Sequence, residues 1–208
     1  MREEAIRIAD RLEATLRIPD ETPRGIVVVA HPLPTHGGTM RNPLVAALAR
    51  AVAARGFYAL RFNFRGVGAS TGEWTGGKEE WKDVRDAVQH AHTVLPGGPC
   101  GITAYSFGAY QTLRWIEEGG RVDGLALVGL PLRSVDLSRR PLPPVPDGTF
   151  IVAAENDQFG NAGELRAELP RARIAEVKGV DHFFVGKRDE VGQLVADELA
   201  RALSSVVP

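Results

Sequence analysis

From residue 26 onward, short and nearly uninterrupted apolar segments alternate with segments of helical periodicity, and no other feature limits the fold as strongly. The apolar segments span residues 26–30, 57–62, 101–104, 125–130, 150–154 and 174–177. Such runs are typical of parallel strands, because crossover helices bury both faces of the sheet. Between them, apolar residues recur at helical spacing over residues 43–55, 81–88, 109–116 and 191–199. This order predicts a three-layer α/β fold with a mostly parallel, doubly wound sheet.

The N-terminal segment differs from the rest, because its apolar residues alternate with polar ones over residues 6–8 and 12–18. This pattern predicts two antiparallel strands that turn at Ala9-Asp10 and extend one edge of the sheet. The connection from Pro131 to Gly148 is rich in proline, which favours an extended and stiff chain. It is too short to form an independent unit. A single domain over residues 1–208 therefore accounts for all predicted elements.

The composition is that of an ordinary globular protein, with 44% apolar and 25% charged residues among 208. No apolar run is long enough to cross a bilayer, and the charged N-terminus lacks the hydrophobic region of a secretory signal. A formal net charge of −1 provides no overall field to attract nucleic acid or an anionic membrane. One cysteine, Cys100, excludes an internal disulfide and a multi-cysteine metal site. We therefore expect a cytoplasmic protein without nucleic-acid or membrane partners.

A candidate nucleophile lies in the sequence Ala104-Tyr105-Ser106-Phe107-Gly108, between a predicted buried strand and a predicted helix. A serine on a tight strand-to-helix turn is lifted above the sheet, and the helix N-terminus provides N–H groups for a developing oxyanion. The alternative interpretation is that the Ser106 hydroxyl merely caps the following helix.

A serine hydroxyl needs a base, and the best-placed histidine is His182. It follows the last predicted strand and precedes the last predicted helix, and loops at this end of the strands carry the chemistry of open α/β sheets. His90 and His92 lie on a predicted helix and face different directions. His31 and His36 belong to the loop after the strand at residues 26–30.

A third group must orient the imidazole, and Asp157 is the preferred candidate because it stands just past the strand at residues 150–154. Glu155 and Asp181 are the alternatives. Glu155 is close enough to the strand to brace the turn, and Asp181 adjoins His182, where neighbouring side chains usually diverge. The order Ser106, Asp157, His182 matches one known arrangement of this chemistry.

The chain resembles the α/β-hydrolase superfamily and, within it, the small lidless serine esterases related to dienelactone hydrolases, over about residues 12–203. The serine turn, Asp157 and His182 carry this resemblance together with further segments: His31-Pro32-Leu33-Pro34, His36-Gly37-Gly38-Thr39-Met40, residues 61–70, Glu155-Asn156-Asp157 and Asp181-His182-Phe183-Phe184. It implies an α/β-hydrolase fold without a lid domain and a triad of Ser106, Asp157 and His182. Two departures from the family pattern are Ala104, where the family usually has glycine, and the short connection from Pro131 to Gly148, where relatives insert a lid. Dienelactone hydrolases themselves use a cysteine nucleophile, whereas the residue here is serine.

An oxyanion hole needs two N–H donors. The Phe107 N–H, just after the serine, is the first. Leu33 is the second candidate, because Pro32 and Pro34 have no N–H. Gly37 is the alternative, since lipases use a similar glycine string. His31 and His36 are then expected to shape this loop by hydrogen bonding.

These residues predict a serine hydrolase that cleaves small carboxylic esters through an acyl-enzyme, with no metal and no organic cofactor. The glycines at residues 66–68 lack the third glycine and the following helix of a dinucleotide site. The expected partner is a small-molecule ester, and a homo-oligomer is compatible with the sequence. A thioesterase, a peptidase, an acyltransferase and a non-catalytic binding protein remain alternatives. Trp74 is assigned either to the pocket or to packing of its loop.

Overall fold

The predicted strands are present in the computed structural model of the chain, which describes residues 1–133 and 141–205. The bounds of three strands coincide with the predicted segments at residues 12–18, 26–30 and 150–154, and those of the others differ by one to four residues at one or both ends. The eight strands are β1 (Arg2–Ile8), β2 (Leu12–Ile18), β3 (Ile26–Ala30), β4 (Tyr58–Phe62), β5 (Cys100–Tyr105), β6 (Gly124–Val128), β7 (Phe150–Ala154) and β8 (Arg173–Val177).

Of the five α-helices among the described residues, four occupy predicted segments and the fifth was not predicted. The helices are α1 (Pro43–Ala54), α2 (Trp81–Val94), α3 (Phe107–Glu117), α4 (Ala162–Glu168) and α5 (Arg188–Ser204), with a 3₁₀ turn, η1 (Pro34–His36). The short helix α4 buries only Ala162 and Leu165, which leaves too few apolar residues for a periodic pattern. A capping box between Asn161 and Glu164 stabilises its first turn.

All eight strands form one sheet in the order β1-β2-β4-β3-β5-β6-β7-β8. β1 pairs with β2, and β2 with β4, in antiparallel fashion, whereas every pair from β4 to β8 is parallel. The predicted antiparallel edge is therefore confirmed. Ala9 and Asp10 have φ of +49° and +55°, the positive values that the two central residues of a type I′ turn require, and the Arg11 N–H closes this turn on the Ile8 carbonyl at 3.1 Å.

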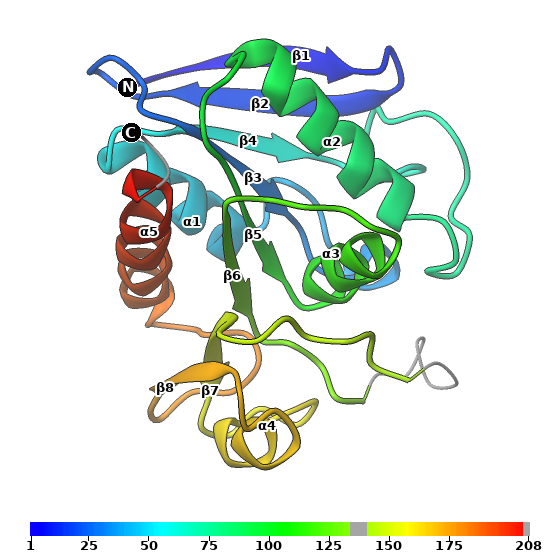
Figure 1. Cartoon of the computed structure of the whole chain (residues 1–208). Helices are drawn as coiled ribbons and strands as arrows, with labels where there is room; N and C mark the ends of the chain where they lie inside the picture. Colours follow the sequence, from blue (N-terminus) through cyan, green and yellow to red (C-terminus); the bar gives the residue numbers. More distant parts are fainter. Residues whose placement is uncertain (134–140, 206–208) are drawn as a thin grey trace.

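The sheet is the middle of three layers (Figure 1). Buried residues of α2, α3 and α4 form one core with one face of the sheet, and those of α1 and α5 form a second core with the other face. β3 contributes to both, since Val28 belongs to the first core and Val27 and Val29 to the second. Burial on both faces explains why the central strands are continuously apolar in sequence.

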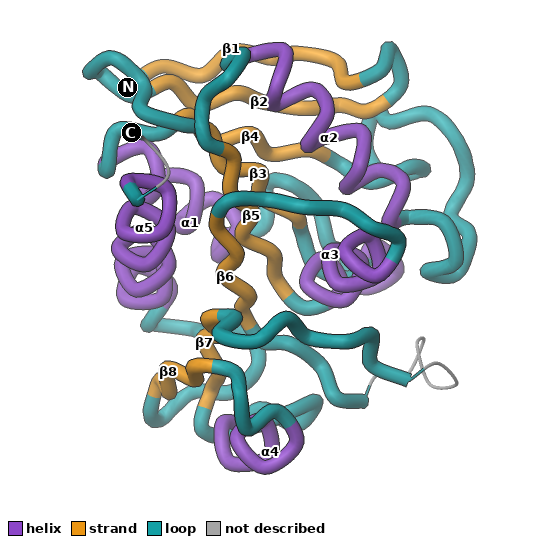
Figure 2. Tube along the Cα trace, viewed as in Figure 1, coloured by secondary structure: helices purple, strands orange, loops and turns teal. Residues whose placement is uncertain are grey.

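The parallel strands direct their carboxyl ends to the same edge, where the loops after β3, β5, β7 and β8 carry the candidate residues. The long loop between β4 and α2 also leaves this side of the sheet (Figure 2). Residues 131–133 and 141–149 of the connection before β7 contain no helix or strand; residues 134–140 of the proline-rich prediction lie outside the described residues. The connection is too short to hold a lid domain.

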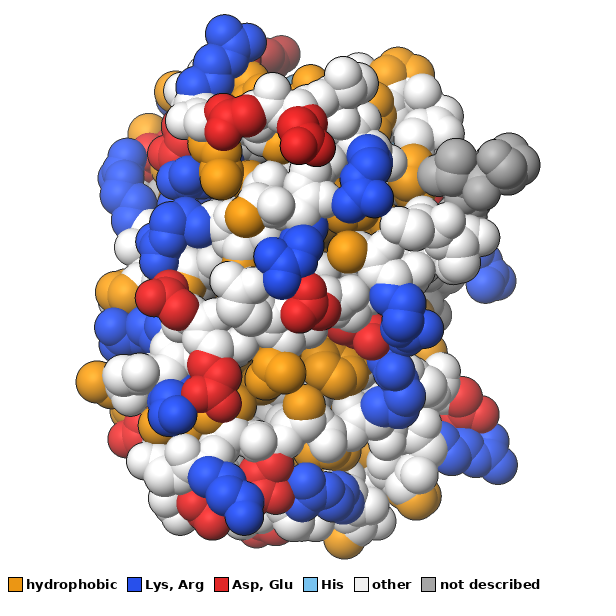
Figure 3. Space-filling model, turned by 90° about the vertical axis from the view of Figure 1, so that its left-hand side faces the viewer, with side chains coloured by type: hydrophobic (Ala, Val, Ile, Leu, Met, Phe, Trp, Pro, Cys, Tyr) orange, Lys and Arg blue, Asp and Glu red, His pale blue; other side chains and the backbone are white. Residues whose placement is uncertain are grey.

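Charged side chains are mixed on the face in Figure 3, where Lys and Arg lie among Asp and Glu.

Inside the fold, Asp83 is fully buried and accepts from the guanidinium and backbone N–H of Arg65. Asn63 accepts from the Met40 N–H at 2.8 Å and donates to Glu13 at 2.7 Å. Arg65 and Asn63 thus brace the loop after β4. No helix in the described ranges is long and apolar enough to cross a bilayer.

Candidate active site

Ser106 lies between β5 and α3 in a strained backbone conformation, with φ +55° and ψ −113°. A non-glycine residue with such a positive φ costs about 1–3 kcal/mol, and such strain is concentrated at functional sites. The Ser106 N–H donates to the Val128 carbonyl at 2.9 Å, which holds the turn against β6. The side chain makes no capping hydrogen bond to α3, so the alternative interpretation as a helix cap does not describe this serine.

The turn depends on the glycine two residues after Ser106. A Cβ on Gly108 would lie 2.8 Å from the carbonyl oxygens of Ala30 and His31, so only glycine lets α3 approach the end of β3 this closely. Ala104 is fully buried in the core with its methyl group accommodated. The departure from the family pattern at this position is therefore tolerated.

The His182 ring is buried beside the serine, in the loop between β8 and α5. Its Nε2 lies 2.9 Å from the Ser106 Oγ. The Tyr105 hydroxyl donates to the His182 carbonyl at 2.9 Å, and burial raises the pKa of this hydroxyl, which keeps it protonated as a donor. The Phe159 ring meets the imidazole edge to face, with centroids 4.7 Å apart. These two aromatic supports were not predicted from the sequence.

The carboxylate beside the imidazole belongs to Asp157, whose Oδ2 lies 2.7 Å from the His182 Nδ1. Its other oxygen accepts from the Phe159 N–H at 2.8 Å, and the side chain is fully buried. A carboxylate only accepts, so Nδ1 carries the proton and Nε2 is the free acceptor for the serine hydroxyl.

The two alternative carboxylates have other partners. Glu155 accepts from the Gly179 N–H at 2.8 Å, and Asp181 accepts from the Phe183 N–H at 3.0 Å. Both brace turns. The structure therefore brings together the three preferred candidates, Ser106, His182 and Asp157.

Both preferred oxyanion donors line the pocket around Ser106. Within the part of the chain that the structure describes, the N–H groups of Leu33 and Phe107 have no hydrogen-bond acceptor. The Gly37 N–H, by contrast, donates to the Pro34 carbonyl at 3.1 Å. Gly37 is also not among the residues that line the pocket. These contacts favour Leu33 and Phe107 over Gly37.

His31 fixes the orientation of the peptide that contains the Leu33 N–H. Its Nδ1 lies 2.7 Å from the Pro32 carbonyl, and its Nε2 accepts from the Phe64 N–H at 3.2 Å. A carbonyl only accepts, so Nδ1 carries the proton. The Pro32 carbonyl and the Leu33 N–H point in opposite directions from one planar peptide. By holding the carbonyl, His31 turns this N–H away from itself, as expected for a residue that shapes the loop.

The His31 environment predicts a specific dependence of stability on pH. Burial lowers the pKa of His31 from 6.5 to about 4. As pH falls, His31 therefore binds a proton near pH 6.5 in the unfolded chain but only near pH 4 in the folded protein. The free energy of unfolding should consequently fall as pH decreases through this window, with His31 contributing about 3 kcal/mol. Urea unfolding at pH 7 and pH 4 measures the loss.

The matched variant for this measurement is His31→Asn, because an Asn amide can still donate to the Pro32 carbonyl but does not titrate. We expect the variant to lose about 3 kcal/mol less than the wild type between the two pH values. Equal losses in the two proteins would contradict the assignment of the slope to His31.

The Ser106 pocket has a volume of about 130 Å³, below the roughly 300–1,000 Å³ of sites for drug-sized ligands. Its lining is mostly apolar and consists of Pro32, Leu33, His36, Gly38, Asn42, Tyr105, Ser106, Phe107, Pro131, Phe159, His182 and Phe183. Trp74 is not part of this lining and packs against Phe107, with ring centroids 5.2 Å apart. Of the two alternatives for Trp74, the structure supports packing.

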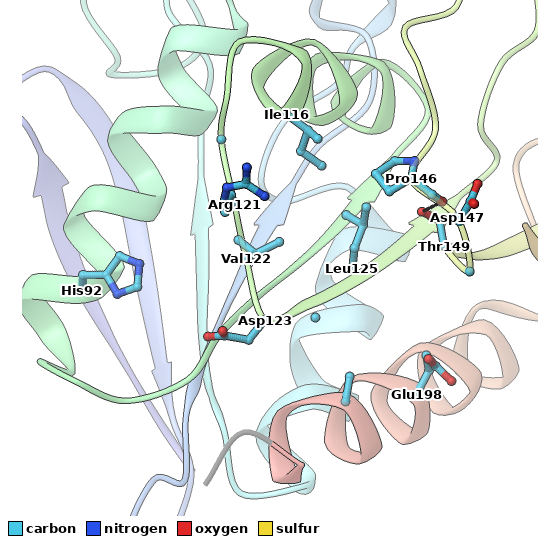
Figure 4. A pocket seen from close by; sticks show the side chains of 14 residues that line it. His92, Ile116, Arg121, Val122, Asp123, Leu125, Pro146, Asp147, Thr149 and Glu198 are labelled. Carbon is cyan, nitrogen blue, oxygen red and sulfur yellow. Dashed lines mark hydrogen bonds between the residues drawn. The ribbon is translucent and has the colours of Figure 1, made fainter.

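A larger hollow of about 590 Å³ lies where β6 and β7 begin, at the opposite edge of the sheet (Figure 4). Its three acidic groups are engaged in the fold: Asp123 accepts from the Cys100 N–H, Asp147 pairs with Arg171, and Glu198 pairs with Arg173 and Arg201. Its described lining contains no serine or cysteine.

Cys100 itself is buried, and burial raises its thiol pKa to about 12, which leaves it unreactive. No group of three possible metal ligands occurs among residues 1–133 and 141–205.

Comparison with known proteins gives a family match and several structural relatives. The family model described as serine aminopeptidase, S33, matches residues 21–158, a range that contains Ser106 and Asp157 but ends before His182. An uncharacterized protein of Rickettsia prowazekii is 27% identical over 187 residues, covering 84% of this chain and 78% of the relative.

Three similar solved structures have identities of 25% to 28%. An α/β serine hydrolase homologue from Coxiella burnetii is 26% identical with a TM-score of 0.82, and 95% of this chain and 97% of that chain are covered. A lidless α/β serine hydrolase from Xanthomonas campestris is 25% identical with a TM-score of 0.84 and coverage of 99% and 97%. A protein of unknown function from Agrobacterium tumefaciens is 28% identical with a TM-score of 0.81 and coverage of 99% and 98%.

Proposed function

The chain belongs to the family described as serine aminopeptidase S33 and has the α/β-hydrolase fold, and from this premise we propose that it hydrolyses small carboxylic esters through an acyl-enzyme. The observation that carries the proposal is the continuous pair of hydrogen bonds, 2.9 Å and 2.7 Å, that links Ser106 through His182 to Asp157. In this arrangement a buried carboxylate holds an imidazole in the tautomer that can accept the serine proton.

In the proposed reaction, the Ser106 Oγ attacks the ester carbonyl carbon while the His182 Nε2 takes its proton. The carbonyl oxygen becomes an oxyanion and accepts hydrogen bonds from the N–H groups of Leu33 and Phe107, each donor contributing about 3–4 kcal/mol. When the tetrahedral intermediate collapses, His182 gives the proton to the departing alcohol oxygen. Water, deprotonated by His182, then attacks the acyl-enzyme, and as the bond to the Ser106 Oγ breaks, His182 returns this proton to the Oγ and the acid is released. Asp157 stabilises the imidazolium in both halves.

The pocket supports esters over the aminopeptidase substrates that the family description names. An aminopeptidase must hold the α-ammonium group of its substrate, and buried or partly buried ammonium groups need a carboxylate partner. The described residues that line the Ser106 pocket include no Asp or Glu. They also include no Lys or Arg to bind the phosphates of a coenzyme thioester. A small volume of about 130 Å³ favours a short acyl group.

A substrate panel tests this choice. We expect kcat/KM for p-nitrophenyl acetate to exceed that for p-nitrophenyl decanoate, because the longer chain does not fit the small pocket. The kcat/KM for p-nitrophenyl acetate should also exceed the values for the acetyl thioester of coenzyme A and for alanine p-nitroanilide. Faster turnover of the anilide would establish a peptidase instead, and faster turnover of the thioester would establish a thioesterase. Transfer of the acyl group to added alcohol in preference to water would establish an acyltransferase.

A further inference from the structure

Phe183 is a large apolar side chain left in solvent directly beside the proposed base. It is 54% exposed, whereas the neighbouring Phe184 is fully buried. Phe183 nevertheless lines the same pocket as Ser106, and its ring lies 5.8 Å from the His182 ring at an angle of 83°. Its exposed face therefore lies at the rim of the pocket, where a bound molecule can cover it.

The backbone of the turn that holds Phe183 at this rim is strained. Phe184 has a φ of +50°, a left-handed conformation that disfavours residues with a Cβ. This conformation sends two consecutive phenylalanines in different directions, Phe184 into the core with Val191 and Phe183 to the pocket. Asp181 fixes the turn, because its side chain accepts from the Phe183 N–H and its carbonyl accepts from the Phe184 N–H. Strain of this kind in a turn next to a site points to a functional requirement.

The proposed reaction determines which part of a substrate meets Phe183. His182 must deliver its proton to the alcohol oxygen of the ester, so the alcohol portion lies on the imidazole side of the serine. The oxyanion lies instead at Leu33 and Phe107. Phe159 and Phe183 both present their rings to the imidazole, with centroid distances of 4.7 Å and 5.8 Å. The departing alcohol is therefore bordered by two aromatic rings.

We propose that Phe183 determines specificity by packing against the alcohol portion of the substrate and that it selects esters of aromatic alcohols. This inference rests on the proposed ester hydrolysis. Aromatic rings attract one another in edge-to-face and offset geometries beyond their buried area, and the rim offers Phe183 for such a contact. A short aliphatic alcohol is too small to cover the ring.

The test compares two acetate esters that differ only in the alcohol, benzyl acetate and ethyl acetate. We expect Phe183→Ala to lower kcat/KM for benzyl acetate about tenfold, equivalent to about 1.4 kcal/mol, while ethyl acetate changes less than about twofold. Phe183→Tyr keeps the ring and should retain the preference. Comparing the two esters within each variant cancels their different intrinsic reactivities.

The matched control is Val185→Ala, because Val185 is 63% exposed in the same turn but does not line the pocket. The control should leave the benzyl-to-ethyl ratio unchanged. An unchanged ratio in Phe183→Ala overturns the proposal, as does an equal loss for both esters, which would mean that Phe183 only supports His182. An equal effect of Val185→Ala overturns it too. Failure of the proposed function looks different, because the wild type would then hydrolyse neither ester.

Discussion

Replacing Ser106 with alanine is expected to reduce the turnover of p-nitrophenyl acetate by roughly a millionfold, because removal of the nucleophile eliminates the acyl-enzyme pathway. The fold should be unaffected. The alanine keeps a Cβ at the same positive φ, so the backbone strain is unchanged, and among the described residues the lost hydroxyl is hydrogen-bonded only to the His182 Nε2. Steady-state kinetics gives the loss in turnover, and thermal unfolding of the same sample gives the melting temperature.

A melting temperature within about 2 °C of the wild type should accompany the inactive variant, since single changes away from core packing alter stability little. A matched control is Ser205→Ala at the exposed end of α5, where the hydroxyl donates to the Ala202 carbonyl. This variant should keep full turnover. Near-wild-type turnover by Ser106→Ala would remove Ser106 from the reaction.

The second large effect is expected for Asp157→Asn, which should lower kcat by about 10⁴-fold. The amide can donate a hydrogen bond to Nδ1, which then loses its proton and acts as an acceptor. The proton moves to Nε2, and the imidazole can no longer take a proton from Ser106. Because the change is isosteric, the side chain still fills its buried site.

Asp181→Asn and Glu155→Gln are the controls for this variant, because both carboxylates lie in nearby turns and hold backbone N–H groups. Each is expected to lower kcat by less than about tenfold, as their oxygens can still accept those hydrogen bonds. A collapse of kcat in either control, combined with an active Asp157→Asn, would identify a different acid and contradict the assignment.

Much of this fold was predictable because its central strands are buried on both faces. Val27, Val28 and Val29 illustrate the point, since consecutive residues pack into opposite cores. The same logic fails for α4, which lies near the edge strand β8 and buries only two side chains. Its remaining signal is the capping box of Asn161 and Glu164, which is weak without a following apolar stripe.

The candidate residues were accessible to prediction because each follows a strand, and parallel strands bring their carboxyl ends to one edge. The contacts that support these residues could not be predicted from the sequence. The Tyr105 hydroxyl reaches the carbonyl of a residue far along the chain, and the Phe159 ring meets the imidazole only in the folded protein. The left-handed backbone at Phe184 has no sequence signal, because glycine is the residue expected there.

The central claim is that His182 and Asp157 activate Ser106. Reaction of the folded wild type with a fluorophosphonate probe, followed by mass spectrometry of the labelled peptide, tests it most directly. The account predicts one label per chain, on Ser106, and a strong loss of labelling in His182→Ala. A wild-type sample that is folded but unlabelled, or labelled at another residue, would contradict it and favour a binding protein built on a hydrolase fold.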